Sequence, residues 1–164
     1  MNFDNFWVDI ITTLVSGVAL TFLFFLAREK LFPVPDITGK WYLEMVTVNT
    51  AYNPYQDMVL RYVLMIWREG NIIKGSAEKI YENSTNGERE FVGNNRTRAS
   101  IEGYIEKNYL SKDKIYIHSI ENGHGRESTN IYDLLLKPDG EMIGAFNSMV
   151  ASQVGTVVCK REPF

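Results

Sequence analysis

The chain has 164 residues, a formal net charge of −3 at pH 7 and one cysteine. Hydrophobic residues make up 45% and charged residues 23%, which excludes a disordered chain, a collagen-like fibre and a disulfide-stapled mini-protein. The mild negative charge gives no electrostatic footprint for DNA or RNA, so neither is an expected partner. Six of the nine Phe lie in the first 32 residues, whereas all nine Tyr lie after residue 40. This uneven distribution indicates two parts that face different solvents.

The first part carries an apolar run, residues 10–27, of 18 residues without a charge. As a helix this run extends about 27 Å, close to the hydrocarbon thickness of a bilayer. A buried core helix and a cleaved signal peptide are the two other interpretations. The run has no polar face, and Asp4 and Asp9 stand where a signal peptide needs basic residues. The sequence therefore favours a retained transmembrane helix.

The residues beside the run set its expected orientation. Arg28 and Lys30 follow the run, and no Lys or Arg precedes it. The positive-inside rule then places the C-terminal part in the cytoplasm, and the lone Cys159 agrees with a reducing compartment. The expected protein crosses the membrane once and carries a cytoplasmic domain.

Small residues recur every four positions within the run, at Thr13, Gly17 and Thr21. Such a small-xxx-small stripe lets helices approach closely in lipid, so we expect the span to form a homo-oligomer through these residues. The alternative is the ordinary tolerance of a membrane helix for Thr and Gly.

The predicted organisation is a transmembrane helix over 1–32, a linker over 33–36 and a β domain over 37–164. Pro33 and Pro35 end the helix and stiffen the linker. Beyond the linker the hydrophobic pattern has a period of two residues. We expect strands at roughly 38–50, 57–68, 71–82, 90–93 continuing irregularly to 106, 113–121, 128–137, 141–148 and 154–161. The strand over 57–68 is apolar in both phases, so its inward face is left open.

Eight short consecutive strands are typical of a sandwich or of an up-and-down barrel. Gly75, Gly103 and Gly144 fall inside the strand pattern, where glycine often marks a bend at a barrel corner or a close approach to a ligand. The predicted fold class is therefore all-β, an eight-stranded up-and-down antiparallel barrel with one N-terminal transmembrane helix.

The residues that usually carry catalysis form no recognisable set. His118 and His124 lack ligand neighbours at metal spacing, and Cys159 is expected to be a buried structural thiol. No Gly-x-Ser-x-Gly elbow, Walker loop, Gly-x-Gly-x-x-Gly unit or His-Glu-x-x-His helix is present. We expect no enzyme activity, no cofactor and no metal site.

Residues suited to binding are more plentiful. Arg61 is an isolated charge in an apolar strand, so it must reach water, a partner or a ligand. Arg96 and Arg98 alternate with a small, apolar face, so they either lie in water or line a barrel mouth facing an anion. The candidate ligand-binding residues are Arg61, Tyr62, Tyr42, Arg96, Arg98, Tyr104, Asn147 and Ser148. We expect Lys160 and Arg161 to be a solvated pair.

The sequence Gly39-Lys40-Trp41 resembles the Gly-x-Trp start of lipocalin-like barrels, in which the Trp closes one barrel end. The whole layout resembles the membrane-anchored β-barrel effectors of bacterial cyclic-oligonucleotide anti-phage systems of the CBASS type. The matching residues are the span 10–27, Gly39-Lys40-Trp41, Gly144-Ala145-Phe146 and Gly155-Thr156-Val157-Val158-Cys159-Lys160-Arg161. That family commonly has two membrane spans, whereas this sequence shows one.

The resemblance implies an abortive-infection effector at the bacterial inner membrane. Its cytoplasmic barrel would sense a cyclic di- or oligonucleotide made by a functionally linked nucleotidyltransferase. Its clustered spans would then disrupt the membrane and kill the infected cell, with the ligand either activating or restraining the protein. A membrane-tethered lipocalin-like binding protein for an apolar small molecule is the alternative. A structural subunit that docks onto another protein is a third interpretation.

Overall fold

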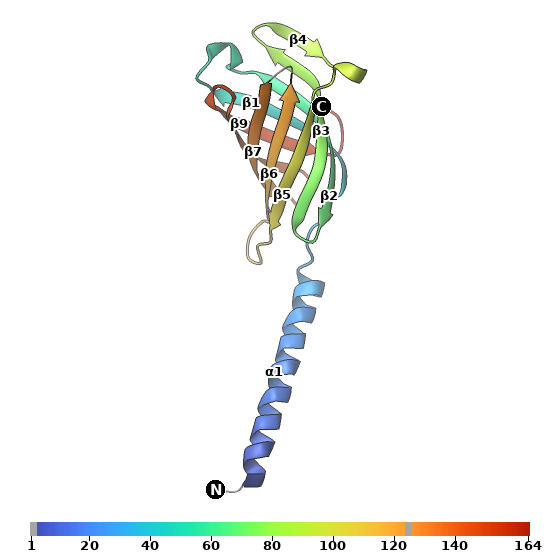
Figure 1. Cartoon of the computed structure of the whole chain (residues 1–164), viewed down its shortest axis with the longest axis vertical. Helices are drawn as coiled ribbons and strands as arrows, with labels where there is room; N and C mark the ends of the chain where they lie inside the picture. Colours follow the sequence, from blue (N-terminus) through green and yellow to red (C-terminus); the bar gives the residue numbers. More distant parts are fainter. Residues whose placement is uncertain (1–2, 124–125) are drawn as a thin grey trace. The chain divides into compact units, whose positions relative to one another are not determined.

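A computed structural model describes residues 3–123 and 126–164 of the chain. The chain falls into two compact units, one ending at Pro35 and the other spanning Asp36–Phe164. The first unit is the helix α1 (Phe3–Leu31), drawn in blue in Figure 1. Within this helix, the stretch Phe6–Leu31 is long and apolar enough to cross a membrane, as the sequence predicts.

The second unit is a closed antiparallel barrel, built from eight of the nine strands found in the described residues (Figure 1). The strands are β1 (Gly39–Asn49), β2 (Val59–Glu69), β3 (Ile72–Ser84), β4 (Gly87–Glu90), β5 (Arg98–Glu106), β6 (Lys114–Gly123), β7 (Arg126–Leu136), β8 (Met142–Ser148) and β9 (Gln153–Lys160). Each barrel strand pairs with the barrel strands before and after it, and β9 pairs with β1 to close the ring. The predicted up-and-down barrel is confirmed.

The structure departs from the prediction in the fourth strand, expected at 90–93 and continuing irregularly to 106. The short strand β4 pairs only with the end of β3, outside the ring. A 3₁₀ turn at Gly93–Asn95 then separates β4 from β5. Gly93 has a φ of +59°, a left-handed conformation that ends an extended run and that glycine adopts without a steric penalty.

Glycines lie where neighbouring strands approach most closely. A Cβ atom added at any of the three predicted positions would overlap a carbonyl oxygen of the adjacent strand. At Gly144 that oxygen belongs to Asp133. Gly155, which the sequence pattern did not single out, stands in the same relation to Val46. These glycines therefore let neighbouring backbones approach closely, whereas the sequence pattern suggests a barrel bend or a close approach to a ligand.

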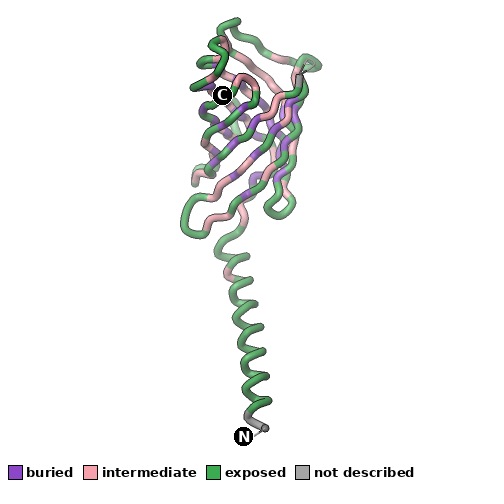
Figure 2. Tube along the Cα trace, turned by 60° about the vertical axis from the view of Figure 1, so that its left-hand side comes forward, coloured by how far each residue is buried: buried purple, intermediate pink, exposed green. Residues whose placement is uncertain are grey.

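Figure 2 shows buried residues alternating with less buried ones along the barrel strands. The buried side chains divide into an apolar half and a polar half of the interior. Toward the end where β1 begins, the buried side chains are Trp41, Ile66, Ile73, Ile105, Ile115, Leu134, Met142 and Cys159. Toward the opposite end, the buried polar side chains are Thr47, Ser119, Glu121, Asn130, Ser148 and Gln153. Hydrophobic burial that stabilises the fold is thus concentrated in one half, which leaves the other half free for polar recognition.

The end where β1 begins, hereafter the Trp41 end, is closed by one aromatic ring and one guanidinium group. The indole Nε1 of Trp41 donates a hydrogen bond of 2.7 Å to the carbonyl of Ile37. Arg161 lies over the indole ring, 3.8 Å from its centroid, and donates to the carbonyls of Lys40 and Thr38 at 3.1 Å each. Arg161 is exposed, as a solvated residue would be, and its guanidinium also covers the Trp41 indole at the base of the barrel.

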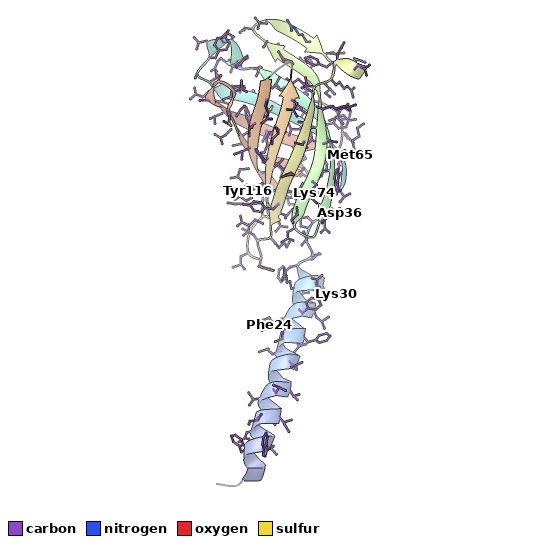
Figure 3. The ribbon with its side chains drawn as sticks, in the orientation of Figure 1. Phe24, Lys30, Asp36, Met65, Lys74 and Tyr116 are labelled. Carbon is purple, nitrogen blue, oxygen red and sulfur yellow. The ribbon has the colours of Figure 1, made fainter. Side chains whose placement is uncertain are left out.

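The structure also settles the face of the second strand. Tyr62, Leu64 and Ile66 point inward, while Met65 and Trp67 are exposed. Figure 3 shows Met65 on the outer surface, as it shows Lys74 and Tyr116 on other strands. Alternation along each strand therefore assigns one face to the interior and the other to solvent.

Candidate functional site

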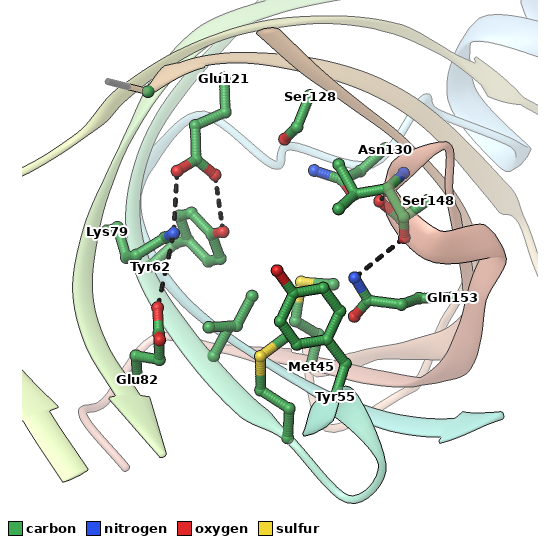
Figure 4. Close-up of a pocket in the computed structure, with 14 residues that line it drawn as sticks. Met45, Tyr55, Tyr62, Lys79, Glu82, Glu121, Ser128, Asn130, Ser148 and Gln153 are labelled. Atoms are coloured by element: carbon green, nitrogen blue, oxygen red, sulfur yellow. Dashed lines mark hydrogen bonds and ion pairs between the residues drawn. The ribbon is translucent and has the colours of Figure 1, made fainter. Parts of the chain in front are cut away.

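The open end of the barrel, opposite the Trp41 end, contains a cavity of about 220 Å³, hereafter the mouth cavity (Figure 4). Its apolar lining comes from Met45, Met58 and Leu60, at the ends of β1 and β2. Its polar lining comes from Tyr55, Tyr62, Lys79, Glu82, Glu121, Ser128, Asn130, Ser148 and Gln153. The cavity is smaller than the roughly 300–1,000 Å³ of pockets for drug-sized ligands, so it fits a single ring system.

One wall of the mouth cavity is a buried charge network. Lys79 Nζ lies 2.9 Å from Glu121 Oε1, and Tyr62 donates from its hydroxyl to Glu121 Oε2 at 2.8 Å. The Glu121 side chain is only 8% exposed and that of Lys79 is 15% exposed. Because both side chains are withdrawn from water, their ion pair and the hydrogen bond from the tyrosine hydroxyl offset the cost of desolvation. Glu82 lies 3.9 Å from the same lysine, toward solvent.

Burial and the nearby Glu121 carboxylate raise the pKa of Tyr62 well above its ordinary value. The phenol therefore stays protonated near neutral pH and acts as a donor to the carboxylate. Tyr132, deeper in the barrel, also has a pKa raised by burial. Both phenols therefore stay protonated across the physiological pH range.

The opposite wall is built around the turn that joins β8 to β9. Thr47 donates from its hydroxyl to Gln153 Oε1 at 2.9 Å, and Gln153 Nε2 donates to the carbonyl of Val150 at 3.0 Å. The backbone of Val150 donates to the Ser148 hydroxyl at 3.3 Å. Two non-glycine residues of this turn, Ala151 and Ser152, adopt positive φ values of +52° and +48°. Such backbone strain is often held at functional sites.

Asn130 supplies a polar group that is available to a ligand. The residue is 5% exposed and its side chain faces the mouth cavity from β7, as Figure 4 shows. Within residues 3–123 and 126–164, its amide makes no side-chain hydrogen bond. An amide offers two donors and one acceptor oxygen, so a bound heterocycle can pair with it in two directions.

A second pocket, hereafter the amide pocket, adjoins the mouth cavity and shares Gly123 with it. Its volume is about 440 Å³ and its lining residues are Gly93, Asn94, Asn95, Arg96, Thr97, Arg98, Asn122 and Gly123. Arg96 and Arg98 both contact the carboxylate of Glu78, at 3.1 and 3.3 Å. Two guanidinium groups share one carboxylate, which leaves a local excess of positive charge.

The structure brings four of the eight predicted ligand-binding residues to the open end. Tyr62 and Ser148 line the mouth cavity, and Arg96 and Arg98 line the amide pocket. Asn147, next to Ser148 in the chain, is exposed on the outer face because side chains alternate along β8. Of the two residues expected to offer hydrogen bonds at the mouth, Ser148 lines the cavity and Asn147 points away from it.

Arg61 and Tyr42 lie on the outside of the barrel, so neither faces an interior ligand. Arg61 Nε lies 2.7 Å from Glu44 Oε2, and its guanidinium sits 4.6 Å from the centroid of the Tyr81 ring. An outer pocket of about 260 Å³ is lined by Arg61, Tyr42, Tyr81, Arg96 and Phe164, among others. The ion pair with Glu44 thus supplies the partner expected for an isolated charge in an apolar strand.

Tyr104 is remote from the open end. It is 51% exposed on the outer face of β5 and stacks on Tyr116, with ring centroids 4.9 Å apart. Its ring is therefore engaged by a cross-strand neighbour rather than by the candidate site.

Sequence reasoning missed Lys79, Glu121, Asn130 and Gln153, which form much of the mouth cavity. One signal was present, because Glu121 shares a strand face with Ile115 and Ile117, where a polar residue is out of place. Lys79 carried the same kind of signal, because it shares a strand face with the buried Ile73 and Ala77. A bulge in β3 pairs Arg61 with Tyr81 and Tyr62 with Lys79, so residue 80 has no direct partner.

Chemistry-bearing residues elsewhere assemble no metal or nucleophile site in the described part of the chain. No group of three His, Cys, Asp or Glu residues that could hold a metal is found among the described residues. His118 is exposed on β6, and His124 lies outside the described residues. Cys159 is fully buried, and burial raises the pKa of its thiol. The thiol is therefore unreactive.

The small-residue stripe on α1 forms a shallow groove with Leu14, Val18, Phe22 and Phe25 along its sides. Thr13 and Thr21 donate their hydroxyl protons to the carbonyls of Asp9 and Gly17, at 2.8 Å each. Their polar groups are thus satisfied within the helix, as a lipid environment requires. A Cβ at Gly17 would meet no atom within 4 Å, so the groove floor is open.

Comparison with known proteins gives no relatives for this chain. No protein-family model matches the sequence. No curated protein and no solved structure matches it either.

Proposed function

We propose that this protein is a membrane-anchored anti-phage effector whose barrel binds a cyclic di- or oligonucleotide at its open end. In this proposal the helices associate in the bacterial inner membrane and disrupt it, which kills the infected cell. The observation that carries the proposal is the junction of the mouth cavity with the amide pocket at Gly123. A ring-sized cavity beside an arginine-containing pocket suits a ligand that joins bases to phosphates.

The mouth cavity has the size and chemistry for one base. At about 220 Å³ it is too small for an entire cyclic dinucleotide but sufficient for a single ring system. Asn130 offers both donors and an acceptor, and Glu121 retains acceptor capacity beyond its two existing contacts. Met45, Met58 and Leu60 supply the apolar surface against which a flat base packs.

The phosphates of such a ligand would lie in the amide pocket. The Arg98 side chain is 84% exposed, so a phosphate reaches its guanidinium without displacing other side chains. Arg96 and Arg98 share the single carboxylate of Glu78, which neutralises one of their two positive charges. A bound phosphate neutralises the other positive charge. Asn94, Asn95 and Asn122 add amide groups that hydrogen-bond to phosphate or ribose.

The anchor supplies the effector step of the proposal. The groove over Thr13, Gly17 and Thr21 permits close packing of two copies of α1. Arg28 and Lys30 follow the span, so the barrel is expected on the cytoplasmic side, where a functionally linked nucleotidyltransferase would release its product. The ligand either promotes or restrains association, according to which state it binds more tightly.

The filled interior weighs against a carrier of apolar molecules. The Trp41 half of the barrel is packed with aromatic and aliphatic side chains. The mouth cavity in the other half is lined largely by polar and charged side chains. Carriers of apolar ligands need a larger and drier interior. The cyclic-nucleotide proposal therefore fits the barrel better than the membrane-tethered lipocalin-like alternative does.

Titration calorimetry of the full chain in detergent, against a panel of cyclic di- and trinucleotides, tests the proposal. We expect one panel member to bind, and Arg98→Ala to weaken its binding by about 10-fold or more. Arg89→Ala, an exposed arginine on β4 outside the amide pocket, is the matched control. Absence of binding by every panel member would exclude the nucleotide-sensor function.

A further inference from the structure

We propose that the loop between β5 and β6, residues 107–113, is a membrane-docking loop that inserts Leu110 into an anionic bilayer interface. This inference goes beyond the nucleotide proposal and requires only that α1 is inserted in a membrane. It assigns a second, peripheral contact with lipid to the barrel itself.

The tip of this loop exposes large side chains to solvent. Leu110 is fully exposed, and Tyr109 beside it is 50% exposed. A leucine held in water leaves apolar surface hydrated that burial would remove from solvent at a gain in free energy. An apolar tip next to an aromatic residue is the composition that favours the boundary between headgroups and acyl chains.

The base of the loop is held rigid, so the exposure of its tip is built into the fold. Asp113 accepts a 2.9 Å hydrogen bond from the backbone of Asn108 and pairs with Lys107 Nζ at 2.8 Å. The Asn108 side chain donates to the carbonyl of Lys112 at 3.1 Å, and the backbone of Leu136 donates to the Asp113 carbonyl. Because the base of the loop is already ordered, docking of Leu110 costs little conformational entropy of the loop.

The loop lies at the Trp41 end of the barrel, the end that follows α1 in the chain. The eight residue steps from Leu31 to Gly39 cover at most about 29 Å when fully extended. A bilayer that holds the helix is therefore within reach of this end, whereas the open end with its ligand pockets faces away from β1's first residue.

The charge and surface around the loop suit an anionic membrane. Residues 107–114 contain three lysines and one carboxylate, a net charge of +2. Above the loop, the stacked rings of Tyr104 and Tyr116 border an apolar surface groove with Ile72 and Ile131. Basic residues near an acidic lipid surface each strengthen binding to it.

Depth-dependent quenching in liposomes tests the proposal on the full chain. Leu110→Cys is labelled with an environment-sensitive fluorophore, because the native Cys159 is buried and does not compete for the label. Matched variants, each with one accessible cysteine, are Val18→Cys in the helix, Asn86→Cys at the open end and Asp139→Cys in the β7–β8 turn at the Trp41 end. The liposomes contain phosphatidylglycerol and acyl-chain spin-labelled lipid.

We expect the labels at positions 18 and 110 to be quenched at least twofold more than those at positions 86 and 139. Replacing phosphatidylglycerol with phosphatidylcholine should reduce the quenching at position 110 only. Quenching at position 18 without any at position 110 would overturn the docking loop while leaving the anchor intact. Equal quenching at positions 110 and 139 would also overturn the docking loop, because equal values indicate that this end of the barrel is near the bilayer without insertion of Leu110. Both readouts are independent of nucleotide binding.

Discussion

The guanidinium of Arg161 lies 3.8 Å from the centroid of the Trp41 ring and bridges the carbonyls of Lys40 and Thr38. The contact ties the end of the chain to the start of β1 and covers the apolar half of the interior. Desolvation over the ring slightly disfavours the charged guanidinium and lowers the pKa of Arg161, which nonetheless stays charged near neutrality.

Arg161→Ala should lower the free energy of unfolding of the barrel by about 1–2 kcal/mol, because a cation–π contact and two charge-assisted hydrogen bonds are lost. Urea denaturation of the full chain in detergent, followed by tryptophan fluorescence, measures the change. Arg68→Ala is the control, since Arg68 donates to the carbonyl of Gly70 in an exposed turn. Equal losses in the two variants would contradict the capping role.

Lys79→Met should lower the free energy of unfolding by about 3–5 kcal/mol, because it leaves the buried Glu121 carboxylate without its counter-charge. The double variant Lys79→Met/Glu121→Leu should recover most of this loss, since no unpaired charge remains. A double-mutant cycle from denaturant titrations gives the coupling energy. A double variant that is as unstable as the sum of the singles would refute the coupling.

Gly144→Ala should destabilise the barrel by about 2–3 kcal/mol, because the added methyl group overlaps the Asp133 carbonyl and forces the strands apart. Ala145→Ser, at the adjacent exposed position, is the control and should change stability by less than about 0.5 kcal/mol. Thermal unfolding by circular dichroism provides the comparison. A fully stable Gly144→Ala protein would rule out the close approach of β7 and β8.

The barrel should lose stability as the pH rises above about 8.5. Burial raises the pKa of Cys159, Tyr62 and Tyr132, so the folded state holds protons that the unfolded chain releases. By linkage, their contribution is fully present below the ordinary cysteine and tyrosine pKa values, near 8.5 and 10, and decreases above them. Tyr62→Phe should therefore flatten the decline above pH 10, whereas Tyr52→Phe, at an exposed position, should not. Urea titrations at pH 7, 9 and 10.5 measure the slope, and an identical slope in both variants would contradict this linkage.

Gly17→Leu should weaken self-association of the anchor by filling the open floor of the groove between Thr13 and Thr21. Förster transfer between differently labelled full chains in liposomes measures association directly, and Leu23→Ile is a control that conserves side-chain volume within the helix. Unchanged transfer in Gly17→Leu would place the helix contact elsewhere.

The fold was predictable because its signals are local. The uncharged run 10–27 needs only a count of residues, and period-two alternation with glycines such as Gly144 indicates a barrel of short strands. Trp41 was recognisable from its neighbours in sequence. Each of these features depends on residues within one helix, strand or turn. Hydrophobic periodicity predicts secondary structure over that same short range of sequence.

The candidate site was only partly predictable because it is formed across the bore of the barrel. Glu121 on β6 pairs with Lys79 on β3, two strands that are not hydrogen-bonded neighbours. The bulge in β3 also turns Tyr81 outward to Arg61, a shift that no alternation pattern records. Arg61 was singled out by its charge alone, and the side of the sheet on which it lies depended on strand register.

Closure of the ring by β1 and β9 has a consequence for synthesis of the protein. The register pairs Leu43 with Cys159, residues separated by nearly the full length of the barrel sequence. Such non-local pairing slows folding, because a long loop must close before its contacts form. One edge of β1 therefore stays unpaired until β9 has been synthesised and has left the ribosome. The helix α1, which is synthesised first, is available for membrane insertion well before then. Newly made chains are most prone to aggregation in that interval, and membrane anchoring would hold them apart.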